Sequence, residues 1–207
     1  LASLRALIAE TRMTLPEGLP PMAVGLFGYL GYDMARQVEH LPNPPEDTLG
    51  LPDAIMLRPT ITAIFDTVRD EILVVTPVFP DQKTDAKSAY ARAAARLDET
   101  LAVLDKPLPI AAPVVSPKVG DIKSNMTKDE YFAMVARGKD YIAAGDVFQV
   151  VPSQRFRRDF TLPPFSLYRA LRRLNPSPFL YYLSMPGFSI VGSSPEILVR
   201  LRDGKVT

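Results

Sequence analysis

Prolines set the main limits on what this chain can fold into, because each one disrupts a helix interior or a central strand. The sequence holds 21 prolines in 207 residues, and four of them fall within Lys106–Lys123, a stretch with little hydrophobic periodicity. This composition is typical of a linker between folded parts. We therefore expect an amino-terminal region at 1–105, a Pro-rich linker at 106–123 and a second region at 124–207.

The segments between the prolines carry helix and strand patterns. Short β-rich runs joined by tight turns, beside separate helices, predict an α+β fold with largely antiparallel sheets. The predicted helices cover the first residues around Leu4, then Lys83–Leu104, a helix ending at Ala144 and Pro164–Leu174. The predicted strands are Ala54–Phe65, Glu71–Val78, Val147–Phe156, Phe179–Met185, Phe188–Gly192 and Ile197–Arg202.

Charge and composition exclude several classes of protein. A net charge of +1 leaves no basic footprint for nucleic acid or for an anionic membrane. No apolar run approaches the length of a transmembrane helix. The chain has no cysteine, which excludes disulfides and thiol chemistry, and a reducing cytoplasm is the simplest location.

Both ends of the sequence fall inside predicted elements. The chain starts without Met within a predicted helix, and it stops just after the Asp203-Gly204 turn, where a partner strand begins. We therefore expect the natural protein to be longer on both sides.

Three segments could carry chemistry, and each also has a purely structural interpretation. Glu196 follows Pro195 between apolar runs, so it is either a partly desolvated proton donor or a surface residue at a turn. Asn175–Pro178 either presents carbonyl groups to a ligand or ends a helix. Gln149 is either a buried amide that needs partners or an edge residue facing water. The residues alone leave all three choices open.

Several motifs together resemble the chorismate-utilising enzyme family. Gly145–Phe156 resembles its helix-to-strand motif, in the Gln-Val-Val-Pro-Ser form of anthranilate synthases. Asn175–Phe179 resembles their tryptophan-binding motif, and Gly192–Glu196 resembles a Gly-Ala-Ser-Pro-Glu segment in which Ser193 replaces the usual Ala. Gly28–Asp33 is similar to part of the amino-terminal region. The resemblance implies the first half of a two-sheet α/β/β/α sandwich.

The resemblance also implies a reaction. Chorismate and ammonia, the latter delivered by a glutamine amidotransferase partner, would give anthranilate and pyruvate. Glu196 matches the acid that protonates the departing ring hydroxyl, since hydroxide is a poor leaving group. Gln149 stands where water-adding relatives carry a lysine base, and a neutral amide favours ammonia, which has its own lone pair.

Regulation and cofactor are implied in the same way. Feedback tryptophan would contact Asn175, Pro178, Phe179 and Leu180, with its indole on apolar surface. The family's Mg2+ ligands lie downstream of this chain, and its Leu-Leu-Glu-Ser tryptophan motif lies upstream. No metal ligand is therefore expected within these 207 residues, and the chain alone is expected to be inactive.

Three alternative functions can be tested. Aminodeoxychorismate synthase aminates chorismate at C4 instead of C2, and the Val151–Ser153 segment together with the Asn175–Pro178 motif argues against it. A tryptophan-sensing or docking module without chemistry would bind tryptophan but not chorismate. A purely structural domain would leave Glu196 without a role.

Overall fold

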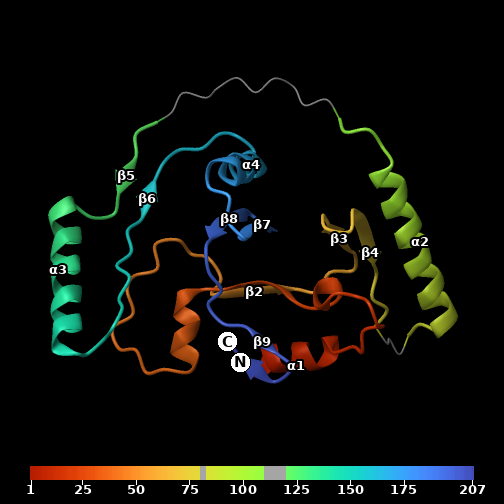
Figure 1. Cartoon of the computed structure of the whole chain (residues 1–207), viewed down its shortest axis with the longest axis horizontal. Helices are drawn as coiled ribbons and strands as arrows, with labels where there is room; N and C mark the ends of the chain where they lie inside the picture. The colour runs from red at the N-terminus through yellow and green to blue at the C-terminus, as the bar shows by residue number, and fades with distance from the viewer. Residues whose placement is uncertain (80–82, 110–119) are drawn as a thin grey trace. The chain divides into compact units, whose positions relative to one another are not determined.

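A computed structural model describes residues 1–79, 83–109 and 120–207 (Figure 1). The chain divides into two compact units, Leu1–Ile110 and Ala111–Thr207. Residues 110–119 of the predicted linker lie outside the described residues, so the linker stays a prediction.

The first unit contains two helices, two 3-10 helices and four strands among its described residues. In chain order they are α1 (Ala2–Thr11), η1 (Pro21–Ala23), β1 (Phe27–Leu30), η2 (Tyr32–Gln37), β2 (Ala54–Leu57), β3 (Thr62–Asp66), β4 (Glu71–Val75) and α2 (Ala86–Leu104). Strand β1 pairs antiparallel with β2, and β3 pairs antiparallel with β4. Helix α2 contacts β4.

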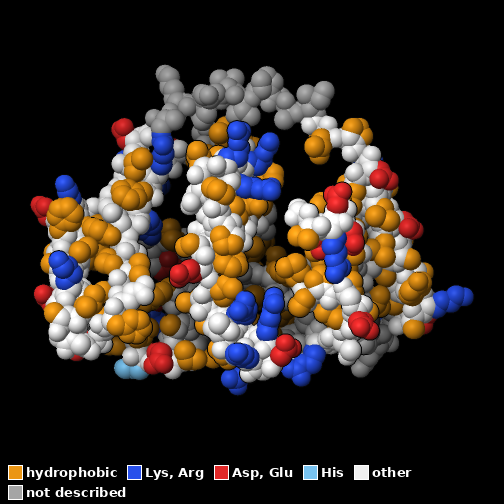
Figure 2. All heavy atoms as spheres, in the orientation of Figure 1, with side chains coloured by type: hydrophobic (Ala, Val, Ile, Leu, Met, Phe, Trp, Pro, Cys, Tyr) orange, Lys and Arg blue, Asp and Glu red, His pale blue; other side chains and the backbone are white. Residues whose placement is uncertain are grey.

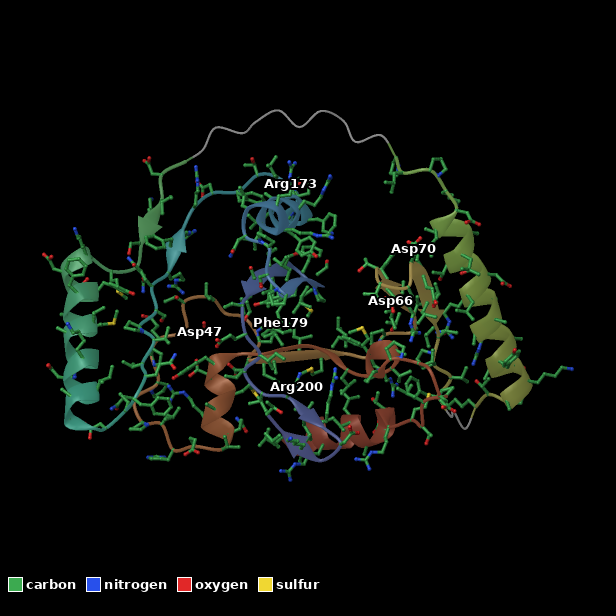
Figure 3. The ribbon with its side chains drawn as sticks, viewed as in Figure 1. Asp47, Asp66, Asp70, Arg173, Phe179 and Arg200 are labelled. Atoms are coloured by element: carbon green, nitrogen blue, oxygen red, sulfur yellow. The ribbon has the colours of Figure 1, made fainter. Side chains whose placement is uncertain are left out.

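The prediction of one strand over Ala54–Phe65 was wrong, because this run forms two strands with different partners. Residues 54–57 belong to β2 and pair with β1, whereas β3 begins at Thr62. Pro59 lies between them and has no N–H to donate to a ladder. The turn between β3 and β4 is confirmed: Asp66 accepts hydrogen bonds from the backbone N–H groups of Val68 and Arg69 (Figure 3).

Helix α2 ends at Leu104 as predicted but begins three residues after Lys83. Asp85 is its N-cap, and the carboxylate accepts a hydrogen bond from the backbone N–H of Ser88 at 3.0 Å. The predicted start missed this cap, which satisfies one of the N–H groups that a first helical turn leaves unpaired.

The second unit contains two helices and six strands among its described residues. They are β5 (Lys123–Ser124), α3 (Lys128–Ala144), β6 (Phe156–Arg157), α4 (Pro164–Leu174), β7 (Phe179–Met185), β8 (Phe188–Ser194), β9 (Leu201–Arg202) and β10 (Lys205–Val206). The pairs β5–β6, β7–β8 and β9–β10 are all antiparallel.

Helix α3 is confirmed at both ends. At its start Thr127 and Glu130 form a reciprocal capping box, with Glu130 accepting from the Thr127 backbone N–H at 2.7 Å. At its end Gly145 adopts a φ of 82°, a left-handed conformation that glycine enters without strain.

The strand predicted over Val147–Phe156 was wrong. Only Phe156 is extended into a ladder, as the first residue of β6, and residues 147–155 have no regular structure. Val150 instead packs against helix α3, where its Cγ1 lies 3.0 Å from the position of a Cβ built on Gly138. Pro152 has no N–H group to donate to a ladder. A strand also needs a partner strand, which the local sequence does not reveal.

Helix α4 and the β7–β8 hairpin form one packed group. Helix α4 contacts both strands, and the Phe165 ring lies 5.5 Å from Tyr168 and 5.3 Å from Tyr182 between centroids. Aromatic rings at this spacing add attraction beyond their burial. This packing fixes the helix against the hairpin that carries the candidate site.

The α+β class and its antiparallel strands are confirmed, but the described strands form five separate two-stranded sheets. The only buried hydrophobic residues among those described are Ala23, Ala93 and Met185. Figure 2 shows apolar side chains across the visible face of the molecule. The two-sheet sandwich therefore stays a prediction.

Candidate functional site

The β7–β8 hairpin brings two of the sequence motifs together. Its two-residue turn is Pro186-Gly187, with a φ of 85° at Gly187, and the ladder runs from the Met185–Phe188 pair to the Phe179–Ser194 pair. Phe179 and Leu180 of the tryptophan-type motif therefore lie opposite Ser194 and Ser193 of the Gly-Ser-Ser-Pro-Glu segment. Phe179 begins β7, and Arg173 lies at the end of α4, just before this motif (Figure 3).

Side-chain hydrogen bonds continue the contact beyond the ladder. Asn175 Nδ2 donates to Ser193 Oγ at 3.3 Å, and Ser193 Oγ donates to the Asn175 carbonyl oxygen at 3.3 Å. The Ser177 hydroxyl donates to the Ser194 carbonyl oxygen. The loop at 175–178 is thus tied to the strand end that leads to Glu196.

Glu196 itself is exposed in this structure. The Ser194 hydroxyl donates to the backbone carbonyl of Glu196 at 2.9 Å, which holds the turn around Pro195, but the carboxylate makes no hydrogen bond or ion pair among the described residues. Of the two interpretations that the sequence left open, the structure shows the surface position at a turn, and the role of Glu196 as an acid stays a prediction.

Gln149 is also exposed, and it lies in the irregular segment after α3. Its side chain makes no hydrogen bond within the described ranges, and no contact there joins it to Glu196. Its role in selecting ammonia stays a prediction, as does tryptophan contact by Asn175, Pro178, Phe179 and Leu180. Of these four, only Leu180 is half-buried.

Sequence reasoning missed Ser177 and Ser193 as links between the motifs. The signal was the Pro186-Gly187 turn, because a two-residue hairpin loop sets the register of every pair along both strands. The ladder ends at the Phe179–Ser194 pair, and the Ser177 hydroxyl reaches the Ser194 carbonyl just beyond it.

The described residues do not fit a Mg2+ site on their own. No group of three or more His, Asp or Glu side chains within these ranges is placed to hold a metal ion, although Mg2+ prefers several oxygen ligands. No described helix is long and apolar enough to cross a membrane.

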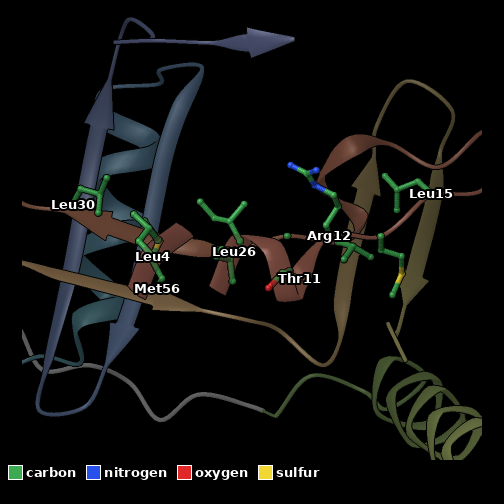
Figure 4. A pocket seen from close by; sticks show the side chains of 11 residues that line it. Leu4, Thr11, Arg12, Leu15, Leu26, Leu30 and Met56 are labelled. Carbon is green, nitrogen blue, oxygen red and sulfur yellow. The ribbon is translucent and has the colours of Figure 1, made fainter. Parts of the chain in front are cut away.

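A concave feature lies in the first unit. An open pocket of about 530 Å³ is lined mainly by apolar side chains of α1, residues 24–26, β1 and β2, including Leu4, Leu26, Leu30 and Met56 (Figure 4). Arg12 is the charged residue in its lining, and the Thr11 hydroxyl donates to the Leu7 carbonyl at 2.7 Å. Sequence patterns gave no sign of this pocket.

The family profile and similar curated relatives agree with each other. A family profile described as chorismate binding enzyme matches residues 2–207. Anthranilate synthase component 1 of Cereibacter sphaeroides is 54% identical over 208 residues, covering all of this chain and 42% of that protein. The protein of the same name from Mycolicibacterium smegmatis is 40% identical, with 100% and 41% covered.

A solved structure agrees with the sequence comparison. The crystal structure of anthranilate synthase component I from Streptococcus pneumoniae TIGR4 superposes with a TM-score of 0.79 at 30% identity, covering 98% of this chain and 46% of that one. The chain therefore spans less than half the length of these relatives. By the family profile and by its identity to these relatives along its whole length, this chain belongs to the chorismate binding enzyme family.

Proposed function

We propose that the natural protein containing this chain is the large subunit of anthranilate synthase. It converts chorismate and ammonia to anthranilate, pyruvate and water. The observation that carries the proposal is the 54% identity to an anthranilate synthase component 1 along the entire chain. The Gln-Val-Val-Pro-Ser form of the segment beginning at Gln149 also supports it.

Glu196 supplies the proton in this reaction. Ammonia forms a C–N bond at ring C2 as the C4–O bond breaks, and the Glu196 carboxyl gives its proton to the departing oxygen, which leaves as water. Loss of the C2 proton and of the enolpyruvyl group, which departs as pyruvate, then makes the ring aromatic. Bound substrate and the remainder of the site would cover the carboxyl and place it beside the departing oxygen.

Gln149 selects the nucleophile. Water needs a base to attack the ring, whereas neutral ammonia attacks with its own lone pair. An uncharged amide cannot accept a proton at neutral pH, so this site activates no water.

Regulation and partners are further parts of the proposal. Tryptophan binds at the 175–180 loop as a feedback inhibitor, and a glutamine amidotransferase subunit delivers the ammonia in the cytoplasm. Mg2+ ligands come from outside this chain, and no step is assigned to the metal.

The two-sheet sandwich also belongs to this proposal. The unpartnered two-stranded ladders would join wider sheets in the natural protein, so the 207 residues alone would not turn over chorismate. The antiparallel pairing and the exposed apolar strand residues support this view.

The test is product identity. The purified natural protein is incubated with chorismate, ammonium salt and Mg2+, and products are separated by chromatography. Anthranilate and pyruvate in equal amounts are expected. Accumulation of 4-amino-4-deoxychorismate would identify the rival synthase, and binding of tryptophan without any conversion of chorismate would identify a sensing module.

A further inference from the structure

The loop between α4 and β7 has few backbone hydrogen bonds of its own. Asn175 donates its backbone N–H to the Leu171 carbonyl at 2.8 Å, but Pro176 and Pro178 have no N–H to donate. Asn175 is itself outside the helical conformation, with φ −136° and ψ 71°. Side chains must therefore hold much of this loop in place.

Ser193 is the residue that holds Asn175. Its hydroxyl accepts from the Asn175 side-chain amide and donates to the Asn175 carbonyl, each at 3.3 Å. Ser193 is half-buried in strand β8, and its ladder partner is Leu180, so the hydroxyl is presented from a fixed backbone. Asn175 is exposed, which leaves its amide accessible to a ligand.

The contact depends on the Ser193 hydroxyl. The methyl group of an alanine at this position could make neither hydrogen bond.

We propose that Ser193 is a positioning residue for the loop at 175–178, where tryptophan is proposed to bind. Its hydroxyl holds the Asn175 amide ready for ligand and so sets tryptophan affinity. This inference rests on the proposed feedback site. Pre-ordering a loop removes part of the entropy that binding would otherwise cost, so losing the hydroxyl weakens binding. The same strand leads to Glu196, and the Ser193 contact therefore links loop order to the reactive end of the hairpin.

The test compares tryptophan affinity among variants of the natural protein. Isothermal titration calorimetry with L-tryptophan is run on the unaltered protein, Ser193→Ala, Ser193→Thr and Ser189→Ala. Ser193→Ala is expected to weaken affinity about three- to tenfold, the size of effect that one or two neutral hydrogen bonds produce. Threonine keeps a hydroxyl and suits a strand, so the tryptophan affinity of Ser193→Thr is expected to stay within about twofold of that of the unaltered protein.

Ser189→Ala is the matched control. Ser189 lies on the same strand opposite Ser184, and its hydroxyl is 3.5 Å from the Tyr182 hydroxyl. Among the described residues, no hydrogen bond joins Ser189 to the loop. The tryptophan affinity of Ser189→Ala is expected to match that of the unaltered protein. Thermal midpoints of all variants show whether an affinity change arises from partial unfolding.

The outcomes separate this inference from the proposed function. If the unaltered protein does not bind tryptophan, the feedback site and the role of Ser193 are both wrong. If it binds tryptophan but Ser193→Ala binds equally well, or if threonine fails to restore affinity in a folded protein, only the role of Ser193 is wrong.

Discussion

At the scale of single residues, the proposed chemistry depends on charge at two positions. Gln149 carries an uncharged amide, whereas Glu196 carries a carboxyl group. The two side chains are both exposed among the described residues, so their roles are decided by experiments on reactivity.

Replacing Gln149 by lysine tests the selection of the nucleophile. A lysine amine can remove a proton from water, so Gln149→Lys is expected to raise water addition to chorismate about 10²-fold, the lower end of what a positioned base contributes. Isochorismate should appear while ammonia-dependent anthranilate formation falls. Both products are measured by chromatography.

The control is Gln37→Lys, the same chemical change at an exposed residue of η2. It is expected to leave the product ratio unchanged. Unaltered anthranilate formation and no water-added product in Gln149→Lys would show that this residue does not select the nucleophile.

Gly28 is the residue on which the β1–β2 pairing depends most. A Cβ at this position would lie 1.9 Å from the Ile55 carbonyl oxygen, a backbone atom that cannot move without separating the strands. Gly28→Ala is therefore expected to lower the free energy of unfolding of the natural protein by about 1–3 kcal/mol, as overpacking does.

Gly25→Ala is the comparison, because no atom lies within 4 Å of a Cβ built there. Gly25→Ala is expected to change the free energy of unfolding by no more than about 0.5 kcal/mol. Urea unfolding of both variants measures the difference, and equal stability would contradict the close approach of the strands at Gly28.

At the scale of elements, the start of helix α3 has a pH-dependent cap. The backbone N–H of Thr127, and then its hydroxyl, donate to the Glu130 carboxylate and lower its pKa below the ordinary value of 4.5. A carboxyl with a lowered pKa stabilises the folded state at pH values above its ordinary pKa. That contribution is lost as pH falls through the lowered pKa.

Hydrogen exchange at the first-turn amides of α3 tests this cap. Protection factors of the natural protein are expected to fall as pH drops below about 4.5, and Glu130→Gln should lack this decrease. Asp129→Asn alters a first-turn carboxyl that makes no hydrogen bond among the described residues, and it should keep the decrease. The same pH response in Glu130→Gln would contradict the cap.

Elements with local signals could be predicted from the sequence. Helix α3 has the Thr127 cap and Gly145, α4 has Pro164 at its start, and the hairpin has Pro186-Gly187; the structure confirms all three. Each signal acts within a few residues, so no distant partner is needed.

Elements that depend on distant partners could not be predicted. Ala54–Leu57 pairs with β1, more than twenty residues earlier, and nothing within the run itself separates it from β3 except Pro59. Residues 147–155 have strand-forming side chains but no ladder among the described residues. The motifs of the candidate site could be found separately, whereas the Asn175–Ser193 contact follows from register and the geometry of the loop.

At the scale of the whole molecule, the described residues expose far more apolar surface than a stable monomer does. Phe148 is 94% exposed, Leu198 97% and Leu174 84%. Large exposed apolar surface marks contacts with further protein. Relatives more than twice as long as this chain could supply that protein from their remaining length.

Dye binding tests whether the apolar surface of the 207 residues lacks cover. The isolated 207-residue chain is expected to raise the fluorescence of 8-anilinonaphthalene-1-sulfonate strongly, because its apolar residues lack cover. The natural protein at equal molar concentration should raise it much less. Equally weak fluorescence from both would mean that the 207 residues bury their apolar surface by themselves.

The most direct test of the account is turnover by the natural protein with Glu196→Gln. Glutamine keeps the shape of the side chain but cannot donate the proton, so kcat for anthranilate formation is expected to fall about 10²- to 10⁴-fold. Asp203→Asn, at the β9–β10 turn, removes another carboxyl nearby in sequence and should keep full activity. Unchanged kcat in a folded Glu196→Gln protein would contradict the claim that this hairpin carries the proton donor.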